Sequence, residues 1–407
     1  MPSTADAPAS TRLSFWTCAA VLAVALWMSG AATPVYPLYA KDWHLTPIVT
    51  TSIFAVYPIV LVIVLLVFGS LSDVVGRRTS ILLGISASLI GVFLFAIAPN
   101  VGIVLIGRAF MGIGVGLSLS PATAKMIDIA GPRNSARTGG ISTASTAVGL
   151  VFATLVGGAL VQYAPFPLHL TYWVLFVVEA LVFALVWRLP RDRDAEAPRW
   201  RPRGVSVPRA LWGPVAAAAL CVSASYSLGA VILSQGASIG VQLVGSSNAL
   251  MTGALLAISM LVIGIVALAS RRIPLPIAAV IALVATALGF GSLVLAASQH
   301  SLALFLVFCV LGGIGYSLFF AAGLQIVSRF APEHHRGSMF STVYLVGYVF
   351  QAATALWLGS EATSGGLAHA VDLGAPVVSA LAAVALILVL VLAVPRRTRG
   401  ASVVEAS

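Results

Sequence analysis

The sequence predicts an all-α membrane protein with twelve transmembrane helices arranged as two pseudo-symmetric six-helix bundles. Three observations support this fold class. Hydrophobic residues make up 60% of the 407 residues, and only 8% are charged. Apolar runs long enough to cross a bilayer recur along the whole chain, and the two halves of the chain repeat the same short motifs.

The composition excludes a soluble protein of this length. Soluble domains have roughly 45–50% apolar residues, and 12 acidic and 22 basic residues cannot cover a water-exposed surface of this size. The net charge of +10 comes from basic residues that punctuate the apolar runs, so we expect no nucleic-acid partner. Cys18, Cys221 and Cys309 lie inside apolar runs, which predicts buried thiols rather than disulfides.

A membrane-spanning helix needs roughly 20 mostly apolar residues. The first apolar run, from Phe15 to Ala32, exceeds the apolar core of a signal peptide, so we expect it to be a retained first helix. The twelve predicted spans are 15–37, 47–71, 79–98, 101–124, 138–162, 169–189, 209–234, 247–269, 274–297, 301–327, 337–359 and 371–394.

The basic residues predict the orientation of these spans. Of the 22 Lys and Arg residues, all but two lie on the side of the chain's N-terminus; Lys41 lies on the other side and Arg108 inside a span. Cytoplasmic loops carry such an excess of Lys and Arg. We therefore expect a multi-pass protein of the plasma membrane with both termini in the cytoplasm, in the style of a bacterial inner-membrane protein.

A polar stretch rich in Pro, Arg and acidic residues divides the chain into two sets of six spans. The predicted organisation is an N-terminal six-helix bundle (1–187), a cytoplasmic linker (188–208), a C-terminal six-helix bundle (209–395) and a cytoplasmic tail (396–407).

The halves repeat each other in sequence. Gly112 and Gly114 match Gly313 and Gly315 at an offset of 201, and "VGLVF" from residue 148 matches "VGYVF" from residue 346. Parallel six-helix repeats of this kind occur in secondary transporters, with the solute path between the halves.

Three segments of the sequence, two in loops and one in a helix, resemble motifs of one known family. "GSLSDVVGRR" from Gly69 resembles the signature of the major facilitator superfamily between helices 2 and 3, G-x-L-x-D-x-x-G-R-R/K. "RAFMGIG" from Arg108 is similar to the family's R-x-x-x-G-x-G pattern in helix 4, and the loop "GPRNSARTG" also looks like the family's. Together with the span count, the linker and the repeat, the resemblance covers essentially the whole chain.

The resemblance implies a cytoplasmic latch made of Gly69, Asp73, Gly76, Arg77 and Asp128. In the family the aspartate of this loop engages the start of helix 11, and the first arginine pairs with an acid at the cytoplasmic end of helix 4. These contacts hold the cytoplasmic side closed and break when it opens. The alternative is that the two arginines of the loop are only inside-positive anchors.

Two ionisable side chains inside spans are candidates for coupling. The resemblance implies a cavity-facing Arg108 that acts in coupling or substrate binding, and the alternative is a side chain that snorkels towards the outer headgroups. Glu179 is the acid placed in the middle of a span, which makes it a proton-relay candidate. The family places helix 6 at the periphery, so a structural, hydrogen-bonded Glu179 is the alternative.

Two departures from a typical proton-coupled drug antiporter weigh against that activity. The first span contains no acid, and residues 153–158 read "ATLVGG" where such proteins carry G-P-x-x-G-G.

Polar and aromatic residues on the spans that line the cavity in this family are candidate substrate contacts: Tyr57, Tyr226, Tyr316, Gln325, Tyr348 and Gln351. An apolar pocket with a few aromatic and amide groups suits hydrophobic solutes, although helix packing is the alternative for each of them. No catalytic or ATP-binding motif is present, so we expect no enzyme activity, no cofactor and no metal site.

The sequence therefore predicts a transporter that works by alternating access, with proton-coupled efflux of a small hydrophobic compound as the first expectation. The alternatives are uptake or facilitated diffusion of a sugar or organic acid, and a non-transporting receptor or assembly protein on the same fold. The expected partners are a small-molecule substrate, protons and the lipid bilayer, and we expect a monomer.

Overall fold

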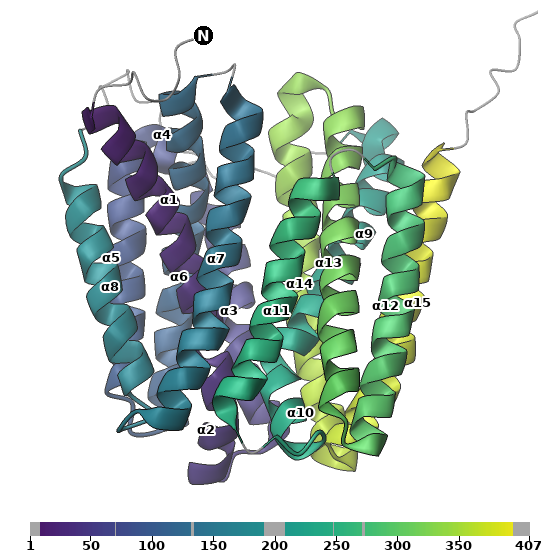
Figure 1. Ribbon diagram of the computed structural model, residues 1–407. Helices are drawn as coiled ribbons and strands as arrows, with labels where there is room; N and C mark the ends of the chain where they lie inside the picture. The colour runs from purple at the N-terminus through teal and green to yellow at the C-terminus, as the bar shows by residue number, and fades with distance from the viewer. Residues whose placement is uncertain are drawn as a thin grey trace, which may run out of the picture.

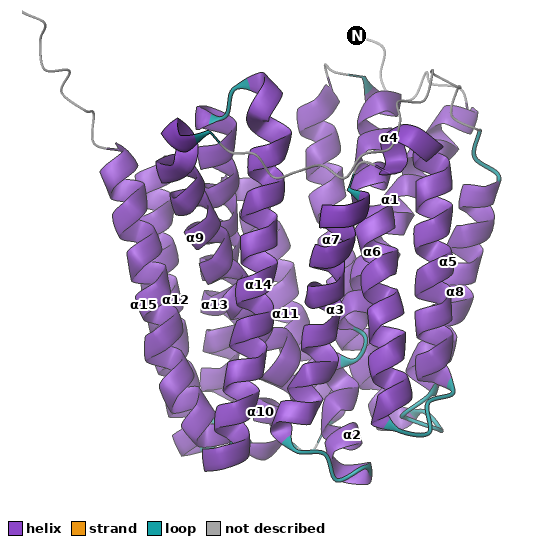
Figure 2. Cartoon of the chain, turned by 180° about the vertical axis from the view of Figure 1, so that it is seen from behind, coloured by secondary structure: helices purple, strands orange, loops and turns teal. Residues whose placement is uncertain are grey.

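The computed structural model describes residues 9–69, 71–131, 134–190, 208–246, 248–270 and 273–393. Within these ranges every regular element is a helix (Figure 2). Twelve helical segments are long and apolar enough to cross a membrane, which confirms the predicted number. Most of the predicted linker and the whole predicted tail lie outside the described residues.

The N-terminal half contains α1 (Ala9–Gly30), η1 (Thr33–Val35), α2 (Tyr36–Asp42), α3 (Pro47–Phe68), α4 (Leu71–Val75), α5 (Arg77–Ala96), α6 (Val101–Ala130), α7 (Ser135–Tyr163) and α8 (Leu170–Trp187). The C-terminal half contains η3 (Arg209–Leu211), α9 (Trp212–Ala230), η4 (Val231–Gln235), α10 (Gly236–Gln242), α11 (Ala249–Ala269), α12 (Leu275–Gln299), α13 (Leu302–Phe330), α14 (Glu333–Gly365) and α15 (Leu367–Ala393).

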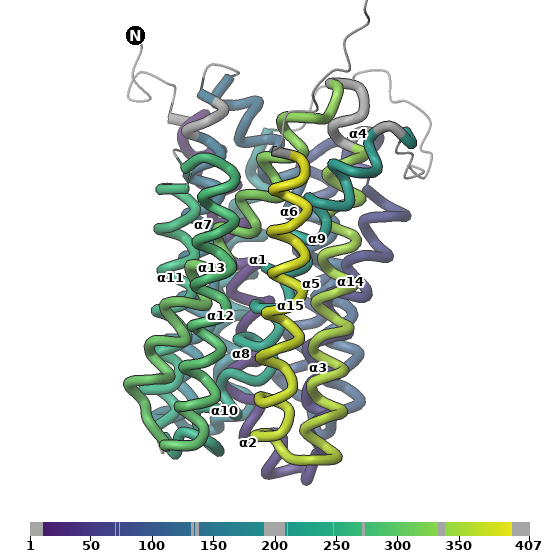
Figure 3. The backbone as a smooth tube through the Cα atoms, turned by 90° about the vertical axis from the view of Figure 1, so that its right-hand side faces the viewer, coloured from purple at the N-terminus to yellow at the C-terminus, as the bar shows by residue number. Residues whose placement is uncertain are grey.

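The two halves stand side by side, and their long helices run between two ends of the molecule (Figure 1). Helix α1 begins and α15 ends at the same end, which we call the termini end; the opposite end is the far end. Seen from the side of the C-terminal half, α15 runs over the outside of the bundle (Figure 3).

The first and seventh spans are longer than predicted, and each is interrupted. Helix α1 gives way to η1 and α2, where Pro34 and Pro37 lack the N–H groups that a continuous helix needs. Helix α9 passes into α10 through the π-helical turn η4. The two interruptions touch across the halves, because the Thr33 hydroxyl donates to the Leu233 carbonyl oxygen at 2.8 Å.

The repeat seen in the sequence is also a repeat of packing contacts. Asn100 caps the start of α6 and Ser301, 201 residues later, caps the start of α13, each accepting a backbone N–H of the first turn. A Cβ on Gly112 would lie 2.8 Å from the Tyr57 carbonyl oxygen of α3. A Cβ on Gly313 would lie 2.9 Å from the Ser259 carbonyl oxygen of α11. The fourth helix of each half therefore packs on the second through the same glycine.

The halves share a hydrophobic core at the far end. One continuous cluster of buried apolar side chains includes residues of the N-terminal half together with residues from the middle and the far end of the other half, such as Leu228, Phe305 and Val371. A separate cluster fills the termini-end part of the C-terminal half, with Val215, Phe319 and Val389. Among the described residues the halves thus join at the far end and keep separate cores at the termini end.

Polar contacts reinforce the joint at the far end. The Ala249 N–H donates to Gln162 Oε1 at 2.7 Å, which links α7 with α11. The Ile48 N–H donates to Thr363 Oγ1 at 3.0 Å, which links α3 with α14. These two helix pairs, together with the contact between the interruptions, connect the halves symmetrically.

Candidate functional site

The predicted latch lies at the termini end of the N-terminal half. Arg77 Nη1 and Asp128 Oδ2 form an ion pair between the start of α5 and the last turn of α6. Their side chains are 32% and 59% exposed. Gly76, directly before α5, has φ of +84°, a conformation that favours glycine. The ion pair expected between Arg77 and Asp128 is therefore present in this conformation.

Two further latch residues lie near this pair in the chain. Gly69 ends α3, and a Cβ there would meet the carbonyl oxygen of Leu65. Asp73 lies in α4, which packs on α5 and α6. The side chain of Asp73 lies outside the described part of the chain, so its predicted contact with the start of α14 stays a prediction.

Arg108 is fully buried where four segments of the N-terminal half meet. Its Nε donates to the Ile53 carbonyl oxygen of α3 at 3.0 Å. Its Nη2 donates to the Ser29 carbonyl oxygen of α1 at 3.0 Å and to Tyr36 Oη of α2 at 3.1 Å. Nη1 faces the Met28 carbonyl oxygen at 3.5 Å. One guanidinium therefore ties together α1, α2, α3 and α6.

The interruption of α1 explains this arrangement. The last turn of a helix leaves carbonyl groups without intrahelical donors, and Ser29 belongs to the last turn of α1. The Met28 carbonyl oxygen in the same turn also accepts the Ala31 N–H at 3.4 Å. A buried carbonyl without a donor costs about 1–3 kcal/mol. The guanidinium supplies the missing donors in a fixed fork, so Arg108 stabilises the broken first span.

The surroundings of Arg108 do not match snorkelling, because the side chain is 0% exposed. Its guanidinium carbon lies 5.5 Å from the centroid of the Tyr57 ring, a cation–π contact. Arg108 therefore touches one predicted cavity residue. Whether it also acts in coupling remains a prediction.

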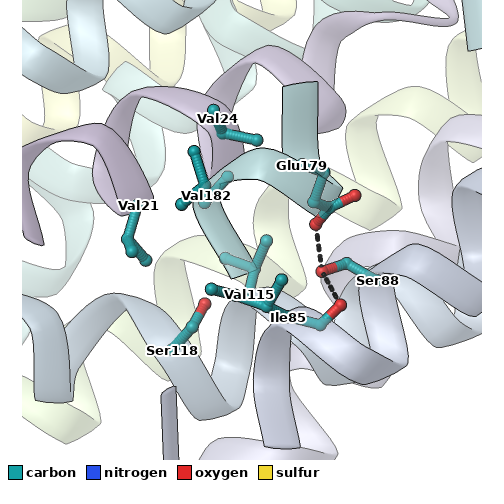
Figure 4. Close-up of a pocket in the computed structure, with 9 residues that line it drawn as sticks. Val21, Val24, Ile85, Ser88, Val115, Ser118, Glu179 and Val182 are labelled. Atoms are coloured by element: carbon teal, nitrogen blue, oxygen red, sulfur yellow. Dashed lines mark hydrogen bonds between the residues drawn. The ribbon is translucent and has the colours of Figure 1, made fainter. Parts of the chain in front are cut away.

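Glu179 is buried inside the N-terminal half and is 2% exposed. Its helix, α8, packs on α5 and α1. The carboxylate oxygen Oε1 is hydrogen bonded to the hydroxyl of Ser88 on α5, as Figure 4 shows. The other oxygen, Oε2, has no hydrogen-bond partner among the described residues. Glu179 therefore lies apart from the interface between the halves.

Three of the predicted cavity tyrosines come together in the C-terminal half. The Tyr226 ring of α9 stacks on Tyr316 of α13 with ring centroids 6.3 Å apart, and lies 4.8 Å from the Tyr348 ring of α14. Phe320 stacks on Tyr226 and Tyr316 at 5.9 and 6.2 Å. We call the six rings that form this continuous series the aromatic cluster: Tyr226, Tyr316, Phe320, Phe340, Tyr344 and Tyr348.

The cluster follows one face of α14 towards the termini end. Phe340, Tyr344 and Tyr348 recur every four residues, and side chains with this spacing share one face of a helix. Tyr344 lies 6.1 Å from Phe320 and 6.5 Å from Phe340, measured between ring centroids. The rings therefore form a path from the middle of the C-terminal half to its termini end.

Gln351 and Tyr57 border the aromatic cluster, whereas Gln325 does not. Gln351 and Tyr316 both lie beside Gly229. A Cβ added to Gly229 would be 3.8 Å from Gln351 Nε2 and 2.9 Å from Tyr316 Cε2. Tyr57 belongs to α3, which packs on α14. Gln325 is nine residues after Tyr316 and so points to the opposite side of α13. It lines a hollow of about 530 Å³ together with Pro274 and Arg329.

Sequence reasoning missed several residues of these sites. Ser88 lies 91 residues from Glu179 in the chain, and no motif connects the two. Tyr36 joins Arg108 only because the first span is broken, which Pro34 and Pro37 could have indicated. The four-residue spacing of the aromatic side chains on the eleventh span could have revealed Phe340 and Tyr344 beside Tyr348.

Comparisons with known proteins identify the family. The family model of the Major Facilitator Superfamily matches residues 15–355. The uncharacterized MFS-type transporter YybF of Bacillus subtilis is 26% identical over 161 residues, covering 39% of each protein. The quinolone resistance protein NorA of Staphylococcus aureus is 25% identical over 133 residues, covering 33% of this chain and 34% of NorA. The matches thus span well under two thirds of these relatives.

Solved structures share the fold over nearly the whole chain. A bacterial homolog of the human lysosomal transporter Spinster, in an inward-facing and unoccupied conformation, superposes with a TM-score of 0.72 at 15% identity, covering 94% of this chain and 98% of that one. The nucleoside transporter NupG superposes with a TM-score of 0.71 at 14% identity, covering 94% and 99%. At such identities the likeness concerns the fold alone.

Proposed function

Because this chain belongs to the Major Facilitator Superfamily and is therefore a multi-pass secondary transporter, we propose that it exports small hydrophobic, aromatic compounds in exchange for protons. The two halves rock about a central site so that the site opens to one side of the membrane at a time. The observation that carries the proposal is the aromatic cluster of the C-terminal half.

The aromatic cluster is free of charge. On the described side chains of α9, α13 and α14, the acidic and basic groups are Arg329 and Glu361. Arg329 lies near the termini end of α13, and Glu361 lies 13 residues beyond Tyr348 towards the far end. Stacked rings without nearby charges favour flat apolar molecules over multiply charged solutes.

The proposed direction of transport follows from one relative and from the orientation of the chain. One relative is a quinolone resistance protein, a name that fits removal of an aromatic compound from the cell. With cytoplasmic termini, as the distribution of Lys and Arg predicts, the termini end faces the cytoplasm.

Proton coupling in this proposal uses the buried acid of the N-terminal half. Glu179 lies inside a span, and burial disfavours the charged form of a carboxyl group. Such a group can bind and release a proton during the cycle. We further propose that the protein acts as a monomer in the plasma membrane and that Arg77 and Asp128 belong to a latch that opens and closes with each cycle.

The test uses purified protein in liposomes with a pH-sensitive dye inside and an imposed pH gradient. A panel of quinolones, hydrophobic cations, neutral aromatic drugs, nucleosides, sugars and organic acids is added one compound at a time. We expect aromatic compounds to move protons and sugars to be inert. Transport of sugars or organic acids without the aromatic compounds would contradict the proposed substrate, and aromatic transport without proton movement would contradict the coupling.

A matched pair of variants links the flux to the aromatic cluster. Tyr226→Ala removes the ring that contacts Tyr316, Phe320 and Tyr348. Leu261→Ala changes a side chain of α11 that is 52% exposed on the surface of the bundle. Loss of flux in the first variant alone supports the proposal, and an equal loss in both would place the effect in general packing.

A further inference from the structure

The hollow beside Gln325 opens at the termini end of the C-terminal half, between the start of α12 and the end of α13. Its volume is about 530 Å³. The wall near α12 is apolar and includes Ile273 and Leu275. The last turns of α13 contribute the polar side chains Gln325, Ser328 and Arg329. The hollow therefore combines an apolar wall with a cation and two neutral polar groups.

This hollow faces away from the aromatic cluster, because Gln325 points to the side of α13 opposite Tyr316. Next to it, one face of α12 carries side chains that are between 41% and 60% exposed: Ile277, Ile281, Val284 and Leu288. An exposed apolar face of a membrane-spanning helix contacts lipid. The 25 residues of α12 extend roughly 37 Å, more than the roughly 30 Å of a bilayer's hydrocarbon core. The hollow therefore lies where the lipid-facing surface reaches the headgroups.

The internal repeat identifies the same place in the N-terminal half. Gly114 of α6 and Gly315 of α13 are equivalent at an offset of 201 residues. A Cβ on Gly114 would contact Ser88 of α5, and a Cβ on Gly315 would contact Thr286 of α12. These contacts align α12 with α5 at an offset of 198 residues.

At these offsets Asp128 corresponds to Arg329, and Arg77 corresponds to Leu275. In the N-terminal half the two charged residues form an ion pair that joins α5 to α6. In the C-terminal half a cation stands at the position of the acid, and an apolar residue stands at the position of the cation. Arg329 is exposed and forms no ion pair with a described side chain. Its guanidinium carbon lies 5.6 Å from the centroid of the neighbouring Phe330 ring.

The other polar groups of the hollow also differ from their counterparts. Gln325 and Ser328 correspond to Ala124 and Ile127, which are apolar. Gln325 and Arg329 are four residues apart, so they share one face of α13. Their amide and guanidinium groups are both hydrogen-bond donors. This end of α13 can therefore bind an anionic acceptor that the matching end of α6 would repel.

We propose that this hollow binds the headgroup of an anionic phospholipid. The phosphate accepts hydrogen bonds from Arg329 and Gln325, beside the start of α12, where the helix dipole favours an anion. The acyl chains lie against the exposed apolar face of α12. The lipid thereby joins α12 to α13, as the ion pair joins α5 to α6 in the other half. Basic pockets between membrane-spanning helices on the cytoplasmic side bind such headgroups, and the termini end is the predicted cytoplasmic end.

Competition between two lipids tests the proposal without any transport. Purified protein in detergent is mixed with equal amounts of phosphatidylglycerol, which is anionic, and phosphatidylcholine, which is zwitterionic, and native mass spectrometry counts the lipid bound. We expect phosphatidylglycerol to be retained preferentially. Arg329→Gln should weaken its binding roughly fivefold, and Arg329→Lys should weaken it less. Equal retention of the two lipids would overturn the proposal.

The matched control is Arg209→Gln, which removes an exposed cation of η3 at the same end of the same half. It should leave the binding of phosphatidylglycerol unchanged. An equal loss in Arg209→Gln and Arg329→Gln would assign the effect to the overall positive charge of this end and overturn the site.

A double variant tests the comparison of the halves. Leu275→Arg combined with Arg329→Asp recreates the ion pair of the N-terminal half in the C-terminal half. Phosphatidylglycerol should raise the melting temperature of the unchanged protein but not that of the double variant. The same rise in both would overturn the proposal. Inorganic phosphate is the second ligand tested, and a rise as large as that given by the lipid would exclude a lipid site.

Discussion

The two halves share their packing but differ in their chemistry. The glycines that bring the fourth helix of each half against the second and third occur at Gly112 and Gly114 in one half and at Gly313 and Gly315 in the other, with matching neighbours. The buried ionisable groups of the N-terminal half have no charged counterpart: the residue 201 positions after Arg108 is Cys309, and "VVEAL" around Glu179 corresponds to "VVSAL" around Ser379.

The C-terminal half shows the reverse pattern. Its interior carries the aromatic cluster, and its seventh span is interrupted by a π-helical turn that needs no arginine to hold it. This difference indicates that both repeats keep small residues at the positions where helices pack closely. The remaining interior positions differ between the halves. We propose that those of the N-terminal half serve proton binding and those of the C-terminal half serve solute binding.

The largest expected effect is a difference in stability between a variant of Arg108 and a variant of its counterpart, Cys309. Arg108→Ala removes the guanidinium N–H groups that bond to Ile53 O, Ser29 O and Tyr36 Oη, and it should lower the free energy of unfolding by about 3 kcal/mol or more. Cys309→Ala should cost only about 1 kcal/mol. Thermal melting of both variants in one detergent measures the difference, and equal losses would contradict the structural role assigned to Arg108.

The next effect should be equal in the two halves. A Cβ on Gly114 would lie 2.6 Å from Ser88 Cβ, and a Cβ on Gly315 would meet Thr286 Oγ1. Gly114→Ala and Gly315→Ala should each destabilise the protein by about 1–3 kcal/mol. Gly291→Ala, in open space on α12, is the control and should be neutral or slightly stabilising. A large loss of stability in only one of the two variants would contradict the proposed symmetry of packing between the halves.

A third prediction concerns solute binding. Tyr226→Ala should weaken the binding of an aromatic solute about 10-fold, because aromatic contacts contribute about 0.5–1.5 kcal/mol each beyond area burial. Phe93→Ala removes a ring of α5 in the other half that is 40% exposed and should not change the affinity. Equilibrium binding of a quinolone to both variants measures this, and a loss in Phe93→Ala alone would reverse the proposed division.

The smallest effect on stability is expected at the latch. Asp128→Asn breaks the ion pair with Arg77, and exposed ion pairs contribute about 0–1 kcal/mol. The melting temperature of the variant should therefore lie close to that of the unchanged protein. Raising the salt concentration should make the difference between the two melting temperatures smaller still. A large loss of stability would mean that the pair supports the fold rather than a movable contact.

Features with a local sequence signature were predictable. The number of spans follows from hydrophobic length, and the ion pair of Arg77 with Asp128 followed from a family motif. The partners of Arg108 were not predictable, because most are backbone carbonyl oxygens, which any residue provides. The π-helical turn at η4 likewise has no Pro or Gly within it to mark it.

Contacts across the fold were equally hidden from the sequence. Glu179 alone suggested a proton relay, but its serine partner depends on how α5 and α8 pack. For Gln325, the prediction from span membership placed it with the tyrosines, whereas its angular position on α13 directs it elsewhere. The spans predicted from the sequence show which helix carries a residue. Its angular position around that helix decides on which face of the helix its side chain lies.

The most direct test of the proposed division is solute counterflow in liposomes at equal pH on both sides. Counterflow requires solute binding and movement of the halves but no net proton transfer. We predict that Glu179→Gln keeps counterflow of a quinolone and loses transport driven by a pH gradient, while Tyr226→Ala loses both at low solute concentration. Loss of counterflow in folded Glu179→Gln, or pH-driven transport that survives there, would contradict the account.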